Sequence, residues 1–564
     1  MAMSTYYKLS FIDYFIFLAF LCLSVGVGVY HAIAEKTEEC LLGGRKMPLL
    51  PVTLSLLTTF MSGITLLGTP AEFYDRGLLW GLIYLTAPVA FLLNGFFLLP
   101  ILYRINTTSI YEYLELRFHS GLLRRLCAAL FIANTLFYAG VTIYAPALAL
   151  NEVLNLDVWF LILLVGVCST ADSLQAGVMY AGIFAIVYKG VGAVGGMEKM
   201  WEKVTESGRV ETLWKWSVDP AQYTSVWIML LSTTALNLCT YGVNQMAVQR
   251  YCSLPSLKDA QKSLLLIVPF YLFLSLLACF MALVMVAYFY RCNPLETGEI
   301  SAYDQMAVLF AIKVSDGIPG LVGVFLACIF AGSLSTVSSG YNSIAAVIYN
   351  DFVLPHSERL TPQRSLYLNK IVVLLSGVVS TGIAFSAGPL GGIVRAAIGL
   401  LGATIGPVLG VYLLGIFSRR CSTRAVTVSF VLTLGFCIFL WVSSVMENPY
   451  RGALPSTFEF ISGELWKQAV RKDHKTGRLR RALRRPGASY FSRISSFAYA
   501  FIGVAMTCLL GELLSFVFEA QSEKYSIGRK YSLTFRGRTR KPVLETSDLS
   551  RGMLLIVDKN AFVE

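Results

Sequence analysis

Long apolar runs, separated by short polar connections, dominate the sequence. A helix that crosses a membrane needs about 20 predominantly apolar residues, and eleven runs approach or exceed that length. They lie near residues 10–30, 49–70, 78–102, 124–150, 224–246, 263–290, 319–346, 368–388, 391–417, 423–445 and 495–518. This pattern predicts an all-α, polytopic membrane protein.

A further apolar block, residues 158–190, is ambiguous because it spans 33 residues, whereas two full crossings and a turn need about 42. Lys and Arg concentrate in the short cytoplasmic loops of membrane proteins. The short connections that are basic lie near 31–47, 103–125, 248–263, 347–370 and 418–424. These five connections all fall on one side of the membrane only if residues 158–190 cross it twice. The sequence therefore predicts about 13 transmembrane helices, with the N-terminus extracellular and the C-terminus cytoplasmic.

The long connection at 446–494 departs from this rule, because its basic stretch at 467–485 would lie outside. Nine Lys and Arg side chains and one acidic residue, Asp473, give the stretch +8 of the net charge of +12. The charge bias weakens in long loops, so a poorly structured insertion, an amphipathic surface helix and an anionic-lipid contact remain open. The predicted layout is a membrane core at 1–445, this basic extramembrane connection at 446–494, a last transmembrane helix at 495–518 and a cytoplasmic tail at 519–564.

Composition supports the membrane class. Hydrophobic residues make up 56% of the 564 residues and charged residues 14%, whereas soluble domains carry roughly 45–50% and 25%. Because the positive charge is local, nucleic acid is not an expected partner, and the lipid bilayer is. The sequence shows no metal-ligand spacing, no nucleotide-binding glycine loop and no Ser-His-Asp arrangement, so we do not expect an enzyme or a bound cofactor.

Residues 58–70 form the first unusual feature within an apolar run. Gly63, Gly68 and Pro70 weaken a helix here, and the surrounding hydroxyl groups can bond to backbone groups that a break releases. Broken helices in transporters use unwound carbonyl groups to coordinate cations. A kinked helix that packs through its small residues is the alternative.

Residues 332–343 form the second feature, with six Ser and Thr side chains and one amide in the middle of an apolar run. Ser335, then Ser338 or Ser339, then Asn342 recur at i, i+3/i+4 and i+7, which is one helix face. Hydroxyl and carbonyl oxygens suit a small, hard cation. The alternative is that the hydroxyl groups bond to the preceding turn of their own helix.

Two ionisable residues lie at membrane depth, and such charges are costly enough to indicate function. Asp172 lies within the ambiguous block, and Arg395 lies just inside the run at 391–417. For Arg395 the alternative is that its long side chain reaches the nearby membrane surface.

Several motifs, in the same order along the chain, resemble the sodium:solute symporter family, most closely the branch that carries monocarboxylates, iodide and water-soluble vitamins. The resemblance runs from about residue 11 to about residue 445. The matching segments are residues 67–72, 111–118, 143–148, 241–245, 248–251 and 332–342. The resemblance implies 13 helices, with two inverted five-helix repeats that contain broken helices and hold their sites near the membrane midplane.

The resemblance also implies the residues of a sodium site. The coupling Na⁺ would bind the carbonyl groups of Thr58, Met61 and Gly332 and the hydroxyl groups of Ser335 and Thr336. Ser338 and Asn342 would extend the polar face for a second ion. Asp172 matches a family carboxylate near the inner sodium path.

By the same resemblance, a substrate pocket would involve the 394–398 face and seven side chains. These are Phe60, Ser62, Thr65, Tyr84, Asn237, Tyr241 and Arg395. The chain departs from its relatives at Thr65, Asn237 and Arg395, so the resemblance does not name the substrate. We hypothesise that the guanidinium group of Arg395 pairs with a substrate carboxylate, whose geometry it matches.

The resemblance implies a sodium-coupled symporter that moves a small organic anion, monocarboxylate- or vitamin-like, across the plasma membrane. An iodide or other anion symporter is one alternative. Relatives carry a short segment that is missing beside Asp172, so a transport-impaired sensor or scaffold is a second. A facilitative channel, which would not need Ser335 or Thr336, is a third.

Overall fold

Helices form all the regular secondary structure in the part of the chain that the computed structural model describes. That part comprises residues 9–34, 45–105, 108–154, 172–315, 318–356, 361–387, 393–418, 420–449 and 488–518. The α-helices are α1 (Phe11–Ala34), α2 (Leu49–Phe60), α3 (Gly63–Arg76), α4 (Leu82–Leu93), α5 (Leu99–Ile105), α6 (Glu112–Phe118), α7 (Gly121–Leu154), α9 (Asp172–Val194), α10 (Met197–Glu206), α11 (Thr233–Gly242), α12 (Gln245–Tyr251), α13 (Leu257–Tyr288), α14 (Met306–Val314), α15 (Leu321–Val347), α16 (Pro362–Phe385), α17 (Ile393–Phe417), α18 (Thr423–Glu447) and α21 (Tyr499–Phe518). Short 3₁₀ and π segments join some of these helices. The π segment Asn94–Leu98 continues α4, and the π segment Ile228–Ser232 precedes α11.

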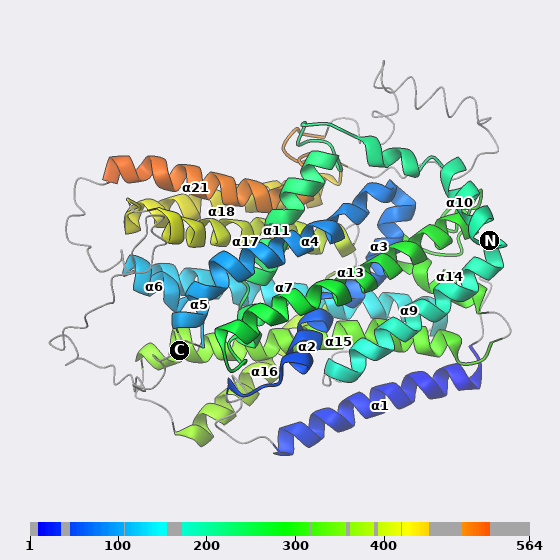
Figure 1. The fold of residues 1–564 in the computed structure, drawn as a ribbon, viewed down its shortest axis with the longest axis horizontal. Helices are drawn as coiled ribbons and strands as arrows, with labels where there is room; N and C mark the ends of the chain where they lie inside the picture. The colour runs from blue at the N-terminus through cyan, green and yellow to red at the C-terminus, as the bar shows by residue number, and fades with distance from the viewer. Residues whose placement is uncertain are drawn as a thin grey trace.

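Most of these helices lie side by side along the long axis of the molecule (Figure 1). Within the described ranges, nine helices are long and apolar enough to cross a membrane, and the bent pair α2–α3 makes a tenth. The predicted all-α, polytopic membrane fold is confirmed. The count of 13 stays a prediction, since the first half of the ambiguous block, residues 155–171, lies outside the described residues. Its second half is the single helix α9.

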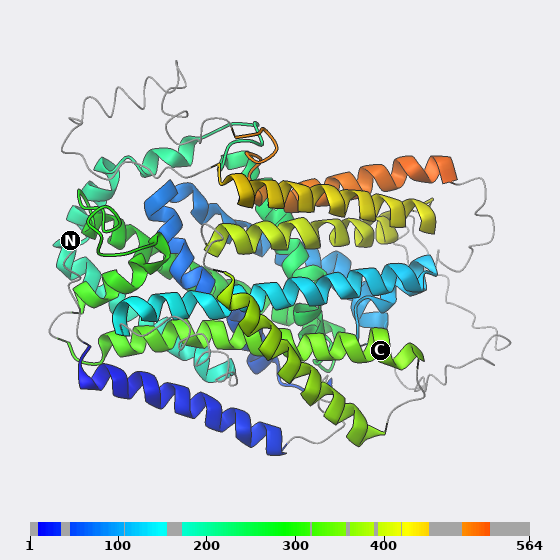
Figure 2. The ribbon, with the colours of Figure 1, turned by 180° about the vertical axis from the view of Figure 1, so that it is seen from behind.

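In the described part of the chain, the start of α1 and the end of α21 lie at opposite ends of the bundle (Figures 1 and 2). Asp13, in the first turn of α1, accepts a hydrogen bond of 2.9 Å from the backbone N–H of Gly323, in the first turn of α15. Beyond the other end of α15, Asp351 pairs with Arg124 at 2.6 Å. The end of α21 lies at this second end, opposite the start of α1 (Figures 1 and 2). Opposite ends are what any odd number of crossings would produce, and the count of thirteen itself stays a prediction.

Two of the helices are interrupted. The first interruption separates α2 from α3 at Met61 and Ser62, with a bend of 50° between the two halves. The second separates α11 from α12 at Val243 and Asn244, where the Asn244 side chain accepts the N–H of Met246 and so caps α12.

Helix α15 is the most buried of the candidate spans, with 83% of its apolar window inside the protein. It packs against α1, α2, α7, α9 and α16. Figure 2 shows α16 crossing the bundle obliquely on the far side. The interruption of α2–α3 therefore faces a helix that is enclosed by protein, where polar backbone is tolerated at membrane depth.

Candidate functional site

The interrupted backbone of α2–α3 lies directly against α15, and glycine makes this approach possible. A Cβ atom at Gly332 would lie 2.9 Å from the carbonyl oxygen of Met61 and 3.1 Å from the backbone nitrogen of Gly63. A residue with a side chain would push the two helices apart. Two of the predicted sodium ligands, Met61 and Gly332, thus meet at one place because Gly332 lacks a Cβ.

Hydroxyl groups of α15 complete this cluster. The Ser335 Oγ donates a hydrogen bond of 3.0 Å to the Thr58 Oγ1. The Thr336 Oγ1 donates to the carbonyl groups of Thr59 at 2.7 Å and of Gly332 at 3.0 Å. Both α15 side chains are buried. Hydroxyl and carbonyl oxygens from both helices therefore surround one small region, a donor set that suits Na⁺.

Some of these hydroxyl groups also make the intrahelical bonds that we considered as the alternative. The Thr58 Oγ1 donates to the carbonyl groups of Leu54 and Ser55, and the Thr59 Oγ1 to that of Ser55. Thr336 bonds both within its helix and across to α2. The two interpretations are therefore compatible, because the hydroxyl groups that support the broken helix also line the interhelical cluster.

Three more residues were predicted to bind sodium, and none of them belongs to this cluster as the structure describes it. Ser338 is half-buried and Asn342 is exposed. Asp172 begins α9, and its side chain lies outside the described residues. Their roles stay predictions. Within the described ranges, no group of three or more His, Cys, Asp or Glu side chains could hold a metal ion.

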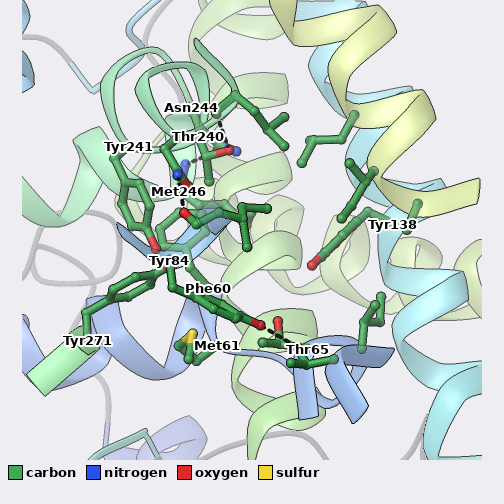
Figure 3. Close-up of a pocket in the computed structure, with 18 of the residues that line it drawn as sticks. Phe60, Met61, Thr65, Tyr84, Tyr138, Thr240, Tyr241, Asn244, Met246 and Tyr271 are labelled. Carbon is green, nitrogen blue, oxygen red and sulfur yellow. Dashed lines mark hydrogen bonds between the residues drawn. The ribbon is translucent and has the colours of Figure 1, made fainter. Parts of the chain in front are cut away.

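A cavity adjoins the cluster through Met61, which belongs to both. The volume of the cavity is about 110 Å³. Its lining comprises Phe60, Met61, Ile64, Thr65, Thr69, Trp80, Ile83, Tyr84, Asn134, Thr135, Tyr138, Leu236, Asn237, Thr240, Tyr241, Asn244, Met246, Tyr271, Ala397, Ile398 and Leu401. Figure 3 shows Tyr138 pointing into it from the side opposite Tyr84 and Tyr241. All of these lining residues are uncharged.

The structure brings five of the seven predicted substrate residues into this lining. They are Phe60, Thr65, Tyr84, Asn237 and Tyr241. The 394–398 face contributes Ala397 and Ile398. Ser62 is fully buried behind the cavity, and its Oγ lies 3.4 Å from the Tyr138 hydroxyl group, which lines it.

Arg395 does not line the cavity. Its Nη1 donates a hydrogen bond of 2.9 Å to the Asn448 Oδ1, and its guanidinium carbon lies 5.5 Å from the centre of the Tyr223 ring. The Tyr223 hydroxyl group donates to the Glu72 carboxylate at 3.0 Å. Arg395 thus joins α17 to α18 and to the end of α3 that faces away from the sodium cluster.

Several polar lining residues escaped the sequence analysis, among them Asn134, Thr135, Thr240 and Asn244. Asn134 and Thr135 interrupt an otherwise apolar run in α7 and are both buried. A polar pair within an apolar run was the signal that could have identified them. Asn244 lies in a segment that carried the family resemblance, but its position at a second helix break could not be seen in the pattern.

The fold and the site together define a class of protein. Secondary transporters have this arrangement: a bundle of membrane-crossing helices in which two helices are interrupted, with an oxygen-rich cluster at one interruption and a cavity beside it. A comparison with family models matches residues 40–430 to the sodium:solute symporter family. The chain belongs to this family.

Relatives with curated descriptions agree with this assignment. The sodium-coupled monocarboxylate transporter 2 of Bos taurus is 35% identical over 448 residues, covering 76% of this chain and 72% of the relative. A putative sodium-dependent multivitamin transporter of Drosophila melanogaster is 33% identical over 529 residues, covering 90% of this chain and 86% of the relative. The protein is thus a sodium-coupled symporter.

A solved structure supports the fold independently. The chain resembles a Na⁺-coupled sialic acid symporter, solved in a substrate-bound, outward-open state, with a TM-score of 0.71. The match covers 90% of this chain and 98% of the other, at 20% sequence identity. At that identity the likeness establishes the shared fold.

Proposed function

We propose that this symporter couples the entry of Na⁺ to the entry of a small organic anion, monocarboxylate- or vitamin-like, across the plasma membrane, without covalent chemistry. Family membership supports the sodium coupling. The relatives named above as monocarboxylate and multivitamin transporters support the substrate class. The N-terminus is extracellular and the C-terminus cytoplasmic in this proposal, as the basic connections favour.

The polarity of the broken helix supports an anion next to a cation. The end of α2 presents carbonyl groups to the oxygen-rich cluster, and the end of a helix carries partial negative charge. The start of α3, with Ile64 and Thr65 in the cavity lining, carries partial positive charge. A carboxylate at this side of the cavity would face both the helix start and the bound Na⁺.

The neutral lining supports an organic substrate over a monatomic anion. Hydroxyl and amide groups lie at well-separated points, from Tyr138 on α7 to Asn244 at the second interruption (Figure 3). An iodide ion can use only a few of them, whereas a carboxylate with a polar or aromatic body can use groups on several walls.

The sodium site proposed here consists of the Thr58, Met61 and Gly332 carbonyl groups with the Ser335 and Thr336 hydroxyl groups. The Thr336 hydroxyl group now donates to the carbonyl of Gly332. On binding, that hydroxyl group turns its oxygen to Na⁺, and the carbonyl can coordinate the ion. Ser338, Asn342 and Asp172 mark a second ion position or the inner path.

The coupling follows from the order of assembly. Sodium fixes the interruption of α2 against α15 and so completes the cavity wall at Met61. The substrate then binds, and the repeats move to open the site inward. Each Na⁺ that enters down a membrane potential contributes about 2.3 kcal/mol per 100 mV to the uphill entry of the substrate.

The observation that carries this proposal is that Met61 belongs both to the cavity and to the cluster against Gly332. The test is uptake of lactate, nicotinate, biotin, pantothenate and iodide by cells in sodium or choline medium. We expect accumulation of at least one organic anion against its gradient in sodium only. Uptake that is equal in both media would favour a channel, and binding without accumulation would favour a sensor.

A further inference from the structure

Arg250 on α12 bonds to both walls of the proposed sodium site. Its Nε donates a hydrogen bond of 2.9 Å to the Ser55 Oγ on α2. Its Nη2 bonds to the Ser339 Oγ on α15. Its Nη1 donates to the carbonyl group of Met246, within α12, at 2.9 Å. One planar guanidinium group thereby joins α2, α12 and α15, which suits the fixed fork of arginine.

These partners lie one helical turn from the proposed sodium ligands. Ser339 follows Ser335 by four residues, which is roughly 6 Å along the helix. The Ser339 Oγ lies 3.1 Å from the Thr59 Oγ1, and the carbonyl group of Thr59 accepts the Thr336 hydroxyl group. Thr59, through its hydroxyl group on one side and its carbonyl group on the other, thus links Arg250 and Ser339 to Thr336, a proposed sodium ligand.

The same arginine is connected to the substrate cavity. Asn244 and Met246, at the start of α12, line the cavity. The Met246 carbonyl group holds the Arg250 Nη1. A substrate that moves the start of α12 therefore moves the residue that holds α2 against α15.

We propose that Arg250 is the positioning residue that couples substrate occupancy to sodium release. This inference rests on the proposed function. It adds the residue that makes the release of sodium depend on bound substrate. In the absence of substrate, Arg250 holds α2 against α15 and places a positive charge between the sodium site and the basic end of the bundle. That charge repels Na⁺ leaving in this direction. Substrate shifts α12, breaks the contacts with Ser55 and Ser339 and lets the ion pass.

The test compares Arg250→Gln and Arg250→Lys with the parent protein in proteoliposomes. The measured quantities are radioactive sodium flux without substrate and the ratio of sodium to substrate transported. We expect Arg250→Gln to raise the substrate-independent flux at least fivefold and to disturb the ratio. Lysine keeps the charge but lacks the fork, so we expect an intermediate flux. Lys258→Gln, an exposed cation at the start of α13, is the control and should behave as the parent.

A second variant keeps the arginine and removes the two serine hydroxyl groups that it contacts on α2 and α15. Ser55→Ala with Ser339→Ala keeps the charge and should raise the flux to an intermediate level, as Arg250→Lys does, even if Arg250→Gln fails to fold. An unchanged flux and ratio in this double variant would overturn the inference. If the parent shows no sodium-driven substrate uptake, the proposed function fails instead, so the two failures are separable.

Discussion

At the scale of single residues, Gly332 is the position on α15 that lets the interrupted backbone of α2–α3 come close. The spacing of hydroxyl residues around it indicated a polar helix face, and the structure shows those residues turned toward the interruption of α2. The sequence could not show that a backbone carbonyl group lies within 3 Å of where its Cβ would be, because that approach depends on two segments about 270 positions apart.

We expect Gly332→Ala to lower the apparent sodium affinity about tenfold or more. Its methyl group would collide with the Met61 carbonyl group, and relieving such overpacking costs roughly 1–3 kcal/mol. Sodium activation of uptake measures the effect, with surface biotinylation to correct for expression. Gly382→Ala on α16 is the matched control, since its Cβ would meet nothing within 4 Å. Equal sodium activation in both variants would show that the approach is not needed.

Arg395 is a residue that the sequence analysis placed in the substrate pocket, and its role can be tested directly. The structure joins it instead to Asn448 and to the ring of Tyr223. We expect Arg395→Gln to lower the maximal uptake rate while the KM for carboxylates changes less than about twofold, because the contacts join helices and not substrate. Concentration series of uptake separate the two parameters. A KM that rises tenfold for carboxylates alone would return Arg395 to the binding site.

At the scale of single helices, apolar run length predicted the elements well and predicted their interruptions less well. Gly63, Gly68 and Pro70 indicated a break, and the chain does break, at Met61 and Ser62. Gly68 and Pro70 instead lie inside α3, where neighbouring helices surround the distorted backbone. The break before α12 was missed, because Val243 and Asn244 do not by themselves weaken a helix as proline does.

Asn94 stabilises the second interrupted helix from a neighbouring element. Its buried Nδ2 donates a hydrogen bond of 2.6 Å to the carbonyl group of Tyr241, two residues before the break. We expect Asn94→Leu to destabilise the protein by about 1–3 kcal/mol, because that carbonyl group loses its partner away from water. The thermal midpoint in detergent measures this, with Phe96→Leu, an exposed site two residues further along the same segment, as the control. An unchanged midpoint would mean that another group satisfies the carbonyl.

At the scale of the whole molecule, the pattern of basic loops predicts where the two ends of the chain lie relative to the bundle. Loop charge predicted opposite locations for the two ends of the chain, and the start of α1 and the end of α21 do lie at opposite ends of the bundle (Figure 1). The cavity could not be located in this way, because its lining comes from helices that are distant in sequence. The resemblance named five of its side chains, whereas Tyr138 and Tyr271, which also line the cavity, were not predicted.

Cys292 provides a test of orientation. It is exposed in the connection between α13 and α14, at the end of the bundle where α1 begins (Figure 1). We expect a membrane-impermeant maleimide to label the protein on intact cells and Cys292→Ser to remove most of that label. Cys421→Ser, which changes a buried thiol, is the control. Labelling at Cys292 only after permeabilisation would reverse the proposed orientation.

The central claim is that oxygens from the interrupted α2–α3 helix and from α15 together bind the coupling ion. Sodium-driven uptake in proteoliposomes by the Ser335→Ala, Thr336→Ala double variant tests it most directly, with Ser343→Ala, a buried hydroxyl group further along α15, as the control. Losing two ligand hydroxyl groups at about 0.5–1.5 kcal/mol each predicts a rise of roughly 10- to 100-fold in the sodium concentration for half-maximal uptake. An unchanged sodium dependence in the double variant would contradict the claim.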